Sequence, residues 1–277
     1  MSTTATMTKP LISDEQWMQY TRDGYLRLGK LLDDEQLAAL QQRIDEIMLG
    51  KAAIDYDKIM MQLDSDTGEY GDLGPQTKGF KGATLKYRKI EQLELDPLFL
   101  QYIQHPICRE ICHRVYGMHV PVAVFRSMFM NKPAGTGTKL PWHQDRWDCL
   151  DRDPLVTVWT ALDPATKHNG CVQVIPGSHR FGVFNPQHPS GFLTDQLAAE
   201  LCDESKVMYV ELEPGEVMLL HNWLLHSSDK NHSDQSRRAF SVCYMDARTV
   251  DQNGTKYPVV FGEGALTVDQ LKSTATA

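Results

Sequence analysis

The pattern of apolar and polar positions divides the chain into a helical first part and a β-rich second part. Two capping boxes, SDEQ at 13–16 and DDEQ at 33–36, indicate helix starts, and apolar residues after the second fall on one helical face. We therefore expect residues 13–50 to be helical. A third helix is predicted over 96–117, bent or begun afresh at Pro106, because proline interrupts the hydrogen-bond ladder of a helix.

Residues 51–88 show neither a helical nor a strand period. Their central stretch, DSDTGEYGDLGPQTKGFKG at 64–82, is rich in glycine. Long loops without regular structure inside a compact domain usually serve a function. We expect this segment to be a lid loop over a binding site rather than a linker.

From residue 120 onward, β-branched and aromatic residues occur in short runs bounded by Gly, Pro, Asn or Asp. A short helix is expected within 193–204. Several short strands at this spacing are typical of an antiparallel sandwich or barrel. The runs predict strands at 122–130, 155–162, 171–177, 206–212, 215–221 and 239–245.

Together these segments predict a mainly β fold with N-terminal helices. A chain of 277 residues is long enough for one large β-core with helical additions. We expect one domain over 1–277, with a helical part at 13–117, a lid loop at 51–88 and a closed double-sheet β-core at about 120–246.

Charge and composition exclude several classes of protein. The net charge of −8 comes without a cluster of Lys and Arg, which argues against nucleic acid as a partner. No apolar run is long enough to cross a membrane, and MSTTATMTKP at the N-terminus lacks the basic-then-apolar order of a signal peptide. The six cysteines are scattered without a Cys-x-x-Cys pair, as expected of reduced, buried thiols. We expect a cytoplasmic protein; the sequence leaves its oligomeric state open.

The stretch PWHQD at 141–145 holds the first candidate for chemistry. In an extended strand, side chains two residues apart point to the same face, so His143 and Asp145 can converge on one metal ion. A redox-active Fe(II) site usually has two histidines and one carboxylate on one face, so a second histidine from a neighbouring strand is required. The alternative is a polar strand end, because a His-x-Asp triplet also occurs by chance.

His226 is preferred over His221 as the second histidine. The sequence HSSDKNHSDQSRR predicts a hairpin whose polar loop leads back into a strand, which would bring Arg237 beside His226. The guanidinium of Arg237 could bind the carboxylate of a 2-oxo acid in a dry pocket. Ser228 could share the face of His226 and donate a hydrogen bond. Arg238 is the competing candidate, since adjacent strand residues point to opposite faces.

Three blocks of sequence carry a resemblance to a known family. They are FRSMFMNKPAGTGTKLPWHQD, VTVWTALDPATKHNGCVQVIPGSHR and LLHSSDKNHSDQSRRAFSVCY, within about residues 85–246. In this order they resemble the phytanoyl-CoA dioxygenase family of Fe(II)/2-oxoglutarate oxygenases. The resemblance implies a double-stranded β-helix (jelly-roll, cupin-like) core, with Fe(II) as metal, 2-oxoglutarate as cosubstrate and O2 as oxidant.

The resemblance also implies roles for individual residues. Fe(II) would be held by the residues that match the family's ligands, His143, Asp145 and His226. The cosubstrate would be bound by Arg237 and Ser228 at its far carboxylate, and further by Lys89, Trp159 and Met128. Without the family, these last three are explained as a surface lysine, a core aromatic and ordinary packing. Related halogenases replace the metal carboxylate with a small residue, so the aspartate argues against halogenation.

The function implied is hydroxylation of an unactivated C–H bond in a small metabolite or natural product of secondary metabolism, with succinate and CO2 as co-products. The alternatives are a non-catalytic ligand-binding protein on the same fold, an iron enzyme that uses no cosubstrate, and an acyl-CoA hydroxylase. No basic cluster looks suited to the phosphates of CoA. Aromatic candidates for the wall of the substrate pocket are Tyr56, Tyr70, Phe80, Trp147 and Trp223.

Overall fold

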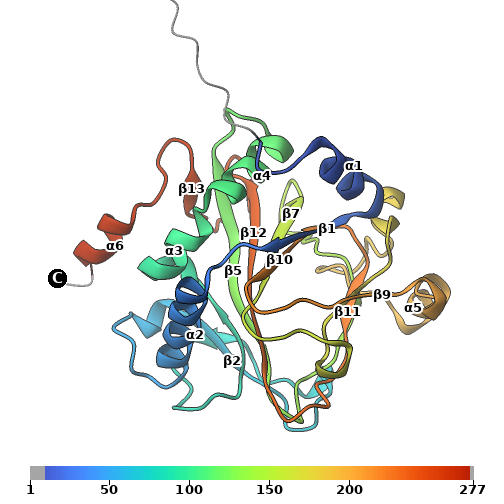
Figure 1. Ribbon diagram of the computed structural model, residues 1–277, viewed down its shortest axis with the longest axis horizontal. Coiled ribbons are helices and arrows are strands. Elements are labelled where there is room, and N and C mark those ends of the chain that lie inside the picture. Colours follow the sequence, from blue (N-terminus) through green and yellow to red (C-terminus); the bar gives the residue numbers. More distant parts are fainter. Residues whose placement is uncertain (1–9, 275–277) are drawn as a thin grey trace, which may run out of the picture.

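Helices flank a β-structure to which strands from both halves of the chain contribute (Figure 1). The computed structural model describes residues 10–274. The N-terminal segment, for which we expected no signal peptide, falls mainly within residues 1–9 and so lies outside the described residues. The α-helices are α1 (Asp14–Asp23), α2 (Asp34–Met48), α3 (Pro97–Ile103), α4 (Pro106–Tyr116), α5 (Asp195–Leu201) and α6 (Val268–Thr274). Short 3-10 helices lie at Tyr56–Lys58, Tyr70–Asp72, Leu93–Leu95, Lys167–Asn169, Ser178–Phe181 and Glu204–Lys206.

The helix starts follow the sequence signals. Ser13 and Asp33 each accept a hydrogen bond from the backbone of the third helical residue, and both capping boxes are complete. The third predicted helix is indeed interrupted, and α4 begins at Pro106. The expectation of helix throughout 13–50 is wrong in the middle, because Gly24 at φ 80° ends α1 and the chain continues as a strand, β1 (Tyr25–Lys30).

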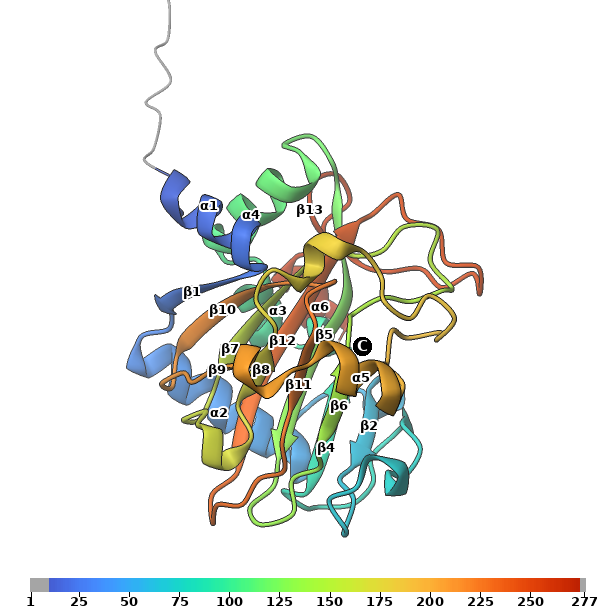
Figure 2. The same ribbon diagram turned by 90° about the vertical axis from the view of Figure 1, so that its right-hand side faces the viewer.

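Two antiparallel sheets face each other (Figure 2). The larger has the order β1-β10-β7-β12-β5-β4-β2-β3, with β13 also paired to β5, and the smaller has the order β6-β11-β8-β9. The strands after β1 are β2 (Met60–Leu63), β3 (Thr77–Lys78), β4 (Tyr87–Glu91), β5 (Val122–Lys132), β6 (Leu140–His143), β7 (Val156–Ala161), β8 (Val172–Val174), β9 (Met208–Val210), β10 (Glu216–His221), β11 (His226–Ser228), β12 (Arg237–Asp246) and β13 (Val259–Phe261).

The structure shortens the predicted loop at 51–88. Strands β2 and β3 lie within it, and β4 starts at its end, so the expectation of a loop holds only for the segments before and between these strands. These strands extend the larger sheet beyond β5. The intervening segment carries Tyr70 and Gln76 to the space between the sheets.

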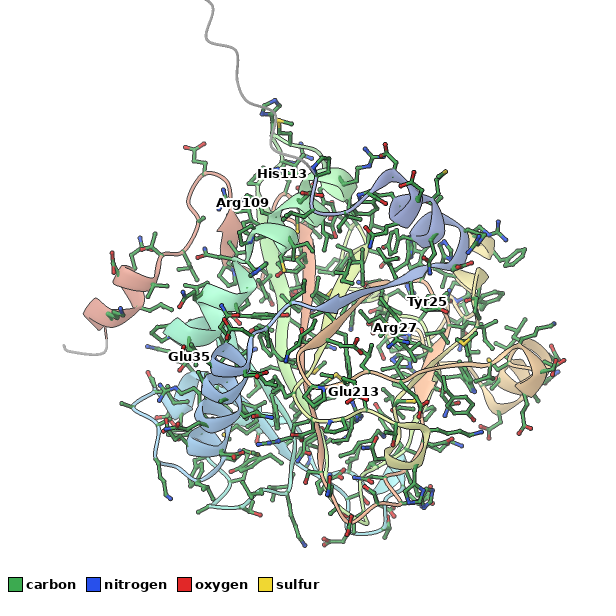
Figure 3. The ribbon with its side chains drawn as sticks, viewed as in Figure 1. Tyr25, Arg27, Glu35, Arg109, His113 and Glu213 are labelled. Carbon is green, nitrogen blue, oxygen red and sulfur yellow. The ribbon has the colours of Figure 1, made fainter. Side chains whose placement is uncertain are left out.

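The larger sheet has two different faces. Its outer face packs against the helices in a core that includes Ile44, Phe99, Ile111, Val158 and Phe240. The helices turn polar residues such as Glu35 and Arg109 outward (Figure 3). The edge strand β1 pairs with β10, and an exposed ion pair of Arg27 with Glu216 at 3.2 Å joins the two strands. Because strand residues alternate between faces, Trp159 and Ser241 point from the inner face toward the smaller sheet.

No helix within residues 10–274 has the length and apolar character needed to cross a membrane.

Candidate metal centre

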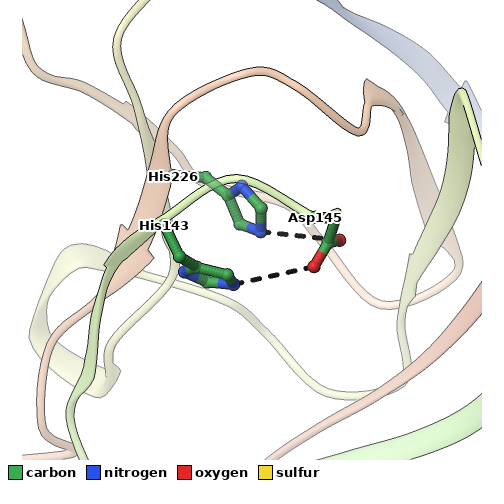
Figure 4. Close-up of side chains that lie close together, drawn as sticks. All are labelled: His143, Asp145 and His226. Carbon is green, nitrogen blue, oxygen red and sulfur yellow. Dashed lines mark ion pairs between the residues drawn. The ribbon is translucent and has the colours of Figure 1, made fainter. Parts of the chain in front are cut away.

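His143, Asp145 and His226 come together between the two sheets (Figure 4). His143 ends β6, His226 begins β11, and the two residues are directly opposite each other in the antiparallel pair. One carboxylate oxygen of Asp145 lies 3.8 Å from Nε2 of His143, and the other lies 3.7 Å from Nε2 of His226. The potential ligand atoms all lie within 4.8 Å of one another, which is close enough to share one ion.

Both imidazole rings are oriented by the backbone. Nδ1 of His143 lies 2.9 Å from the carbonyl of Pro141, and Nδ1 of His226 lies 2.9 Å from the carbonyl of Leu224. A carbonyl only accepts hydrogen bonds, so Nδ1 carries the proton and Nε2 presents its lone pair toward Asp145. Burial and the neighbouring imidazole hold the pKa of His143 well below its usual value. A neutral ring with Nε2 exposed to the cluster is the form that binds a metal.

The three side chains face a cavity of about 240 Å³ between the sheets. Its lining combines basic, hydroxyl and aromatic side chains with methionines. All eight site residues expected from the sequence line it: His143, Asp145, His226, Arg237, Ser228, Lys89, Trp159 and Met128. The structure therefore brings the expected residues to one place, while their roles remain predictions.

Arg237, the first residue of β12, is 2% exposed, and its Nε and Nη1 have no hydrogen-bond partner among the described residues. Its guanidinium lies 5.4 Å from the centre of the Trp159 ring, whose own buried Nε1 is also unpartnered in the described part of the chain. Burial lowers the pKa of Arg237 to about 10. A buried, unpaired cation costs several kcal/mol, roughly, and an anion at this end of the cavity would offset that cost.

Lys89 on β4 adds a second cation to the same wall. It lies opposite Met130 of β5, and neither a hydrogen bond nor an ion pair joins its ammonium to a described residue. Burial, and after it the nearby Arg88 and Arg126, lower the pKa of Lys89 to about 7. Bringing a carboxylate next to the ammonium would oppose both causes.

The predicted hairpin between His226 and Arg237 is wrong. The strand of His226, β11, pairs with β6 and β8 in the smaller sheet, whereas β12 pairs with β5 and β7 in the larger one. The segment between them crosses from one sheet to the other. Arg237 nevertheless lines the same cavity as His226, because the two sheets enclose it.

The aromatic candidates divide into two groups. Tyr70 and Trp147 line the cavity. The other three do not: Tyr56 packs on Phe80 with ring centres 5.1 Å apart, and Trp223 donates to Asp153 at 3.0 Å.

Sequence reasoning missed several residues of the cavity, and Phe192 and Arg126 are the two that bear on its chemistry. Phe192 stacks on His143 with ring centres 4.8 Å apart and an angle of 13°, and Tyr70 packs against the same Phe192 at 5.3 Å. Phe192 belongs to an irregular segment before α5, where no period marks it in the sequence. Arg126 also lines the cavity; on the inner face of β5 its signal was the break that it makes in an apolar strand.

Comparison with known proteins agrees with this geometry. The family model described as phytanoyl-CoA dioxygenase (PhyH) matches residues 20–239. A probable phytanoyl-CoA dioxygenase of Caenorhabditis elegans is 26% identical over 258 residues, covering 88% of this chain and 80% of the relative. Phytanoyl-CoA dioxygenase domain-containing protein 1 of Bos taurus is 29% identical over 270 residues, covering 85% of this chain and 91% of the relative.

A solved structure shares the fold. The crystal structure of EctD from S. alaskensis with 2-oxoglutarate and 5-hydroxyectoine has a TM-score of 0.67 and 22% identity, covering 88% of this chain and 79% of that one. The predicted jelly-roll, cupin-like fold is confirmed, and so is the prediction of a dioxygenase. Since the family model covers most of its length, the chain belongs to the phytanoyl-CoA dioxygenase family.

Proposed function

We propose that the protein binds Fe(II) and 2-oxoglutarate and hydroxylates an unactivated C–H bond of a small metabolite or natural product. His143, Asp145 and His226 hold the metal. Arg237 and Ser228 bind the far carboxylate of 2-oxoglutarate, and Lys89, Trp159 and Met128 form the wall beside it. When bound, Fe(II) and 2-oxoglutarate supply the oxidation of the substrate by O2, with release of succinate and CO2.

The observation that carries this proposal is the buried guanidinium of Arg237 in the same cavity as the metal cluster. Two of its nitrogens and the indole Nε1 of Trp159 lack partners within residues 10–274. An iron enzyme without a cosubstrate would need its substrate to supply the anion at that end, whereas 2-oxoglutarate supplies one itself. A carboxylate can satisfy the planar donor pair of an arginine with two parallel hydrogen bonds.

The remaining residues orient and enclose the reactants. The backbone carbonyls of Pro141 and Leu224 fix the imidazole rings, so that Nε2 of each points to the metal position. Phe192 covers one face of His143, and Tyr70 packs behind Phe192. This aromatic cover excludes water from the reacting atoms and screens the oxidant from solvent.

The volume of the cavity favours a small substrate over an acyl-CoA. Sites for drug-sized ligands usually measure about 300–1,000 Å³. The cavity here is about 240 Å³, and 2-oxoglutarate would take part of that space. Its lining also includes charged side chains, namely Lys89, Arg126, Asp145 and Arg237, whereas a long acyl chain requires a continuous apolar channel.

Anaerobic titration tests the proposal. Adding 2-oxoglutarate to the protein with Fe(II) should produce the weak visible charge-transfer band of an iron-chelated 2-oxo acid. His143→Ala should abolish the band, and the exposed His168→Ala should retain it. Succinate formation across a panel of small metabolites then identifies the substrate.

The rival functions give different results in these two assays. A cosubstrate-free iron enzyme would bind Fe(II) and show no change on adding 2-oxoglutarate. A non-catalytic binding protein would form no succinate with any metabolite. Either result would contradict the proposal.

A further inference from the structure

The cavity holds a third basic side chain, which the cosubstrate site does not use. Arg126 lies on the inner face of β5 and lines the same cavity as the metal cluster. No hydrogen bond joins its guanidinium to any described residue. Its contacts are with aromatic rings, at 4.8 Å from the centre of Trp147 and 5.2 Å from the centre of Phe125.

One carboxylate lies near Arg126 but accepts no hydrogen bond from its guanidinium. Oε1 of Glu91 is 3.9 Å from Nε of Arg126, beyond hydrogen-bond distance. That carboxylate oxygen is itself buried without a hydrogen-bond partner among the described residues. Glu91 therefore attracts the guanidinium while leaving its N–H groups available to another acceptor.

Arg126 and Arg237 stand at opposite ends of the larger sheet's inner wall. Arg237 is directly opposite Lys132 of β5, and Lys132 is six residues along that strand from Arg126. At about 3.4 Å per residue, the backbone separation is roughly 20 Å. A five-carbon diacid held at Arg237 is much shorter than this backbone separation, which favours different molecules at the two arginines.

The carboxylate of the metal cluster lies near the Arg126 end of this wall. Cys243 is directly opposite Arg126 on β12, and burial, and after it Asp145, raise the pKa of Cys243. Trp147, on which the guanidinium of Arg126 packs, follows Asp145 by two residues. An acceptor bound by Arg126 would therefore lie on the carboxylate side of the metal cluster, away from Arg237. This is the side on which a primary substrate must enter if 2-oxoglutarate occupies the Arg237 end.

The charges of the cavity favour an anionic substrate. Its lining contains three side chains of Lys and Arg and one carboxylate, Asp145. The charges of Fe(II) and of the 2-oxoglutarate dianion cancel, so the excess of positive charge on the lining side chains remains. The planar guanidinium suits a carboxylate, and the nearby carboxylate of Glu91 disfavours a doubly charged phosphate by repulsion.

We infer that Arg126 binds the carboxylate of the primary substrate, which is a small monocarboxylic acid. The inference rests on the proposed function, because it takes the Arg237 end to be filled by 2-oxoglutarate. Trp147 and Phe125 hold the guanidinium in place by cation–π contacts, and the one-third of its side chain that stays exposed faces the entering substrate.

Matched pairs of acid and amide test this assignment. Suitable probes are hexanoate and hexanamide, phenylacetate and phenylacetamide, and L-proline and L-prolinamide, each added to the protein with Fe(II) and 2-oxoglutarate. At least one acid should stimulate succinate formation or shift the charge-transfer band at a concentration at least tenfold lower than its amide. Arg126→Gln should remove that preference, and the exposed Arg248→Gln should keep it.

The cosubstrate titration separates the possible failures. At pH 6, where Lys89 is charged with or without Arg126, Arg126→Gln should leave the dissociation constant for 2-oxoglutarate within about twofold of the wild-type value, measured by the charge-transfer band. A loss of cosubstrate affinity as large as that of Arg237→Gln would overturn the inference by placing Arg126 in the cosubstrate site. A normal band without any preference for acids, or a preference that survives Arg126→Gln, would also overturn it. Absence of the band in the wild type would instead refute the proposed function.

Discussion

Arg237 and Arg238 are neighbours on β12 and point to opposite faces of the larger sheet. Arg237 is 2% exposed and faces the cavity, with Nε and Nη1 lacking partners within the described part of the chain. Arg238 points outward, where two of its nitrogens bond the carboxylate of Asp163 at 2.8 Å and a third bonds Asp45 at 2.7 Å. Arg238 is therefore paired within the protein, whereas two donors of Arg237 have no partner among the described residues.

Exchanging each arginine should therefore have a different effect. Arg237→Gln should raise the dissociation constant for 2-oxoglutarate by about 100-fold, because losing one partner of a desolvated charge pair costs about 2–5 kcal/mol. Its free energy of unfolding should not fall, since a buried unpaired cation is removed. Arg238→Gln should keep cosubstrate affinity within about twofold and lower the free energy of unfolding by about 1–3 kcal/mol. Anaerobic titration and urea denaturation measure the two quantities.

Binding of 2-oxoglutarate should weaken as the pH rises above neutrality. Burial lowers the pKa of Lys89 to about 7, so its ammonium is charged below that pH and neutral above it. A bound carboxylate favours the charged form and raises this pKa, so binding takes up a proton above pH 7. The dissociation constant should then rise by up to about tenfold per pH unit above 7, until the pKa of the complex is reached.

Lys89→Met supplies the comparison for this pH effect. The variant should bind 2-oxoglutarate more weakly at pH 6.5, and its dissociation constant should stay nearly level between pH 7 and 8.5. Lys86→Met, at an exposed position three residues earlier, should behave as the wild type. An unchanged pH profile in Lys89→Met would assign the titration to another group.

Two of the three residues of the metal cluster were predictable from sequence because their geometry is local. His143 and Asp145 are two residues apart at a strand end, and their convergence needs only the alternation of an extended chain. The identity of the second histidine came from its position in a late strand and from the family resemblance. The structure places His226 opposite His143 in the pair of β11 with β6.

The incorrect predictions concern features of the fold that depend on tertiary packing. A polar loop between two strands suggests a hairpin, yet β11 and β12 join different sheets, which the local sequence does not encode. The six residues of β1, flanked by two well-capped helices, are too short to show a strand period, and they become a strand by pairing with β10. Phe192 lies in an irregular segment, so only the folded chain shows that it stacks on a candidate metal ligand.

Two glycines in the first part of the chain offer a matched test of packing. Both Gly24 and Gly29 have positive φ, at 80° and 78°. A Cβ at Gly24 would collide with Nδ1 of His179 and lie 2.7 Å from a methyl of Leu224, whereas nothing lies within 4 Å of a Cβ at Gly29. Both alanine variants incur the cost of the left-handed conformation, about 1–2 kcal/mol.

Gly24→Ala should lose a further 1–3 kcal/mol or so of stability, because the turn from α1 into β1 must move away from His179. The difference between the urea denaturation midpoints of Gly24→Ala and Gly29→Ala measures this additional loss of stability directly. Equal midpoints would show that His179 and Leu224 can move aside without strain.

The lid-loop prediction can be tested at Tyr70. Its ring packs on Phe192, which stacks on His143, and the guanidinium of Arg88 lies 5.4 Å from the centre of the Tyr70 ring. Filling the cavity should stabilise this cover, because Tyr70 and Phe192 both line it. Fe(II) and 2-oxoglutarate should therefore slow cleavage by a glutamate-specific protease after the exposed Glu69 at least threefold.

Two comparisons distinguish closure of the loop from a general gain in stability. Cleavage after Glu263, exposed and outside the lid, should slow much less, because that site gains no contact with the cavity. Phe192→Ala should remove most of the protection at Glu69, since Tyr70 then has no ring to close against, while the variant keeps all three candidate metal ligands. Equal protection at both sites would mean that ligands stabilise the whole fold, and equal cleavage with and without ligands would show that the loop is not a lid.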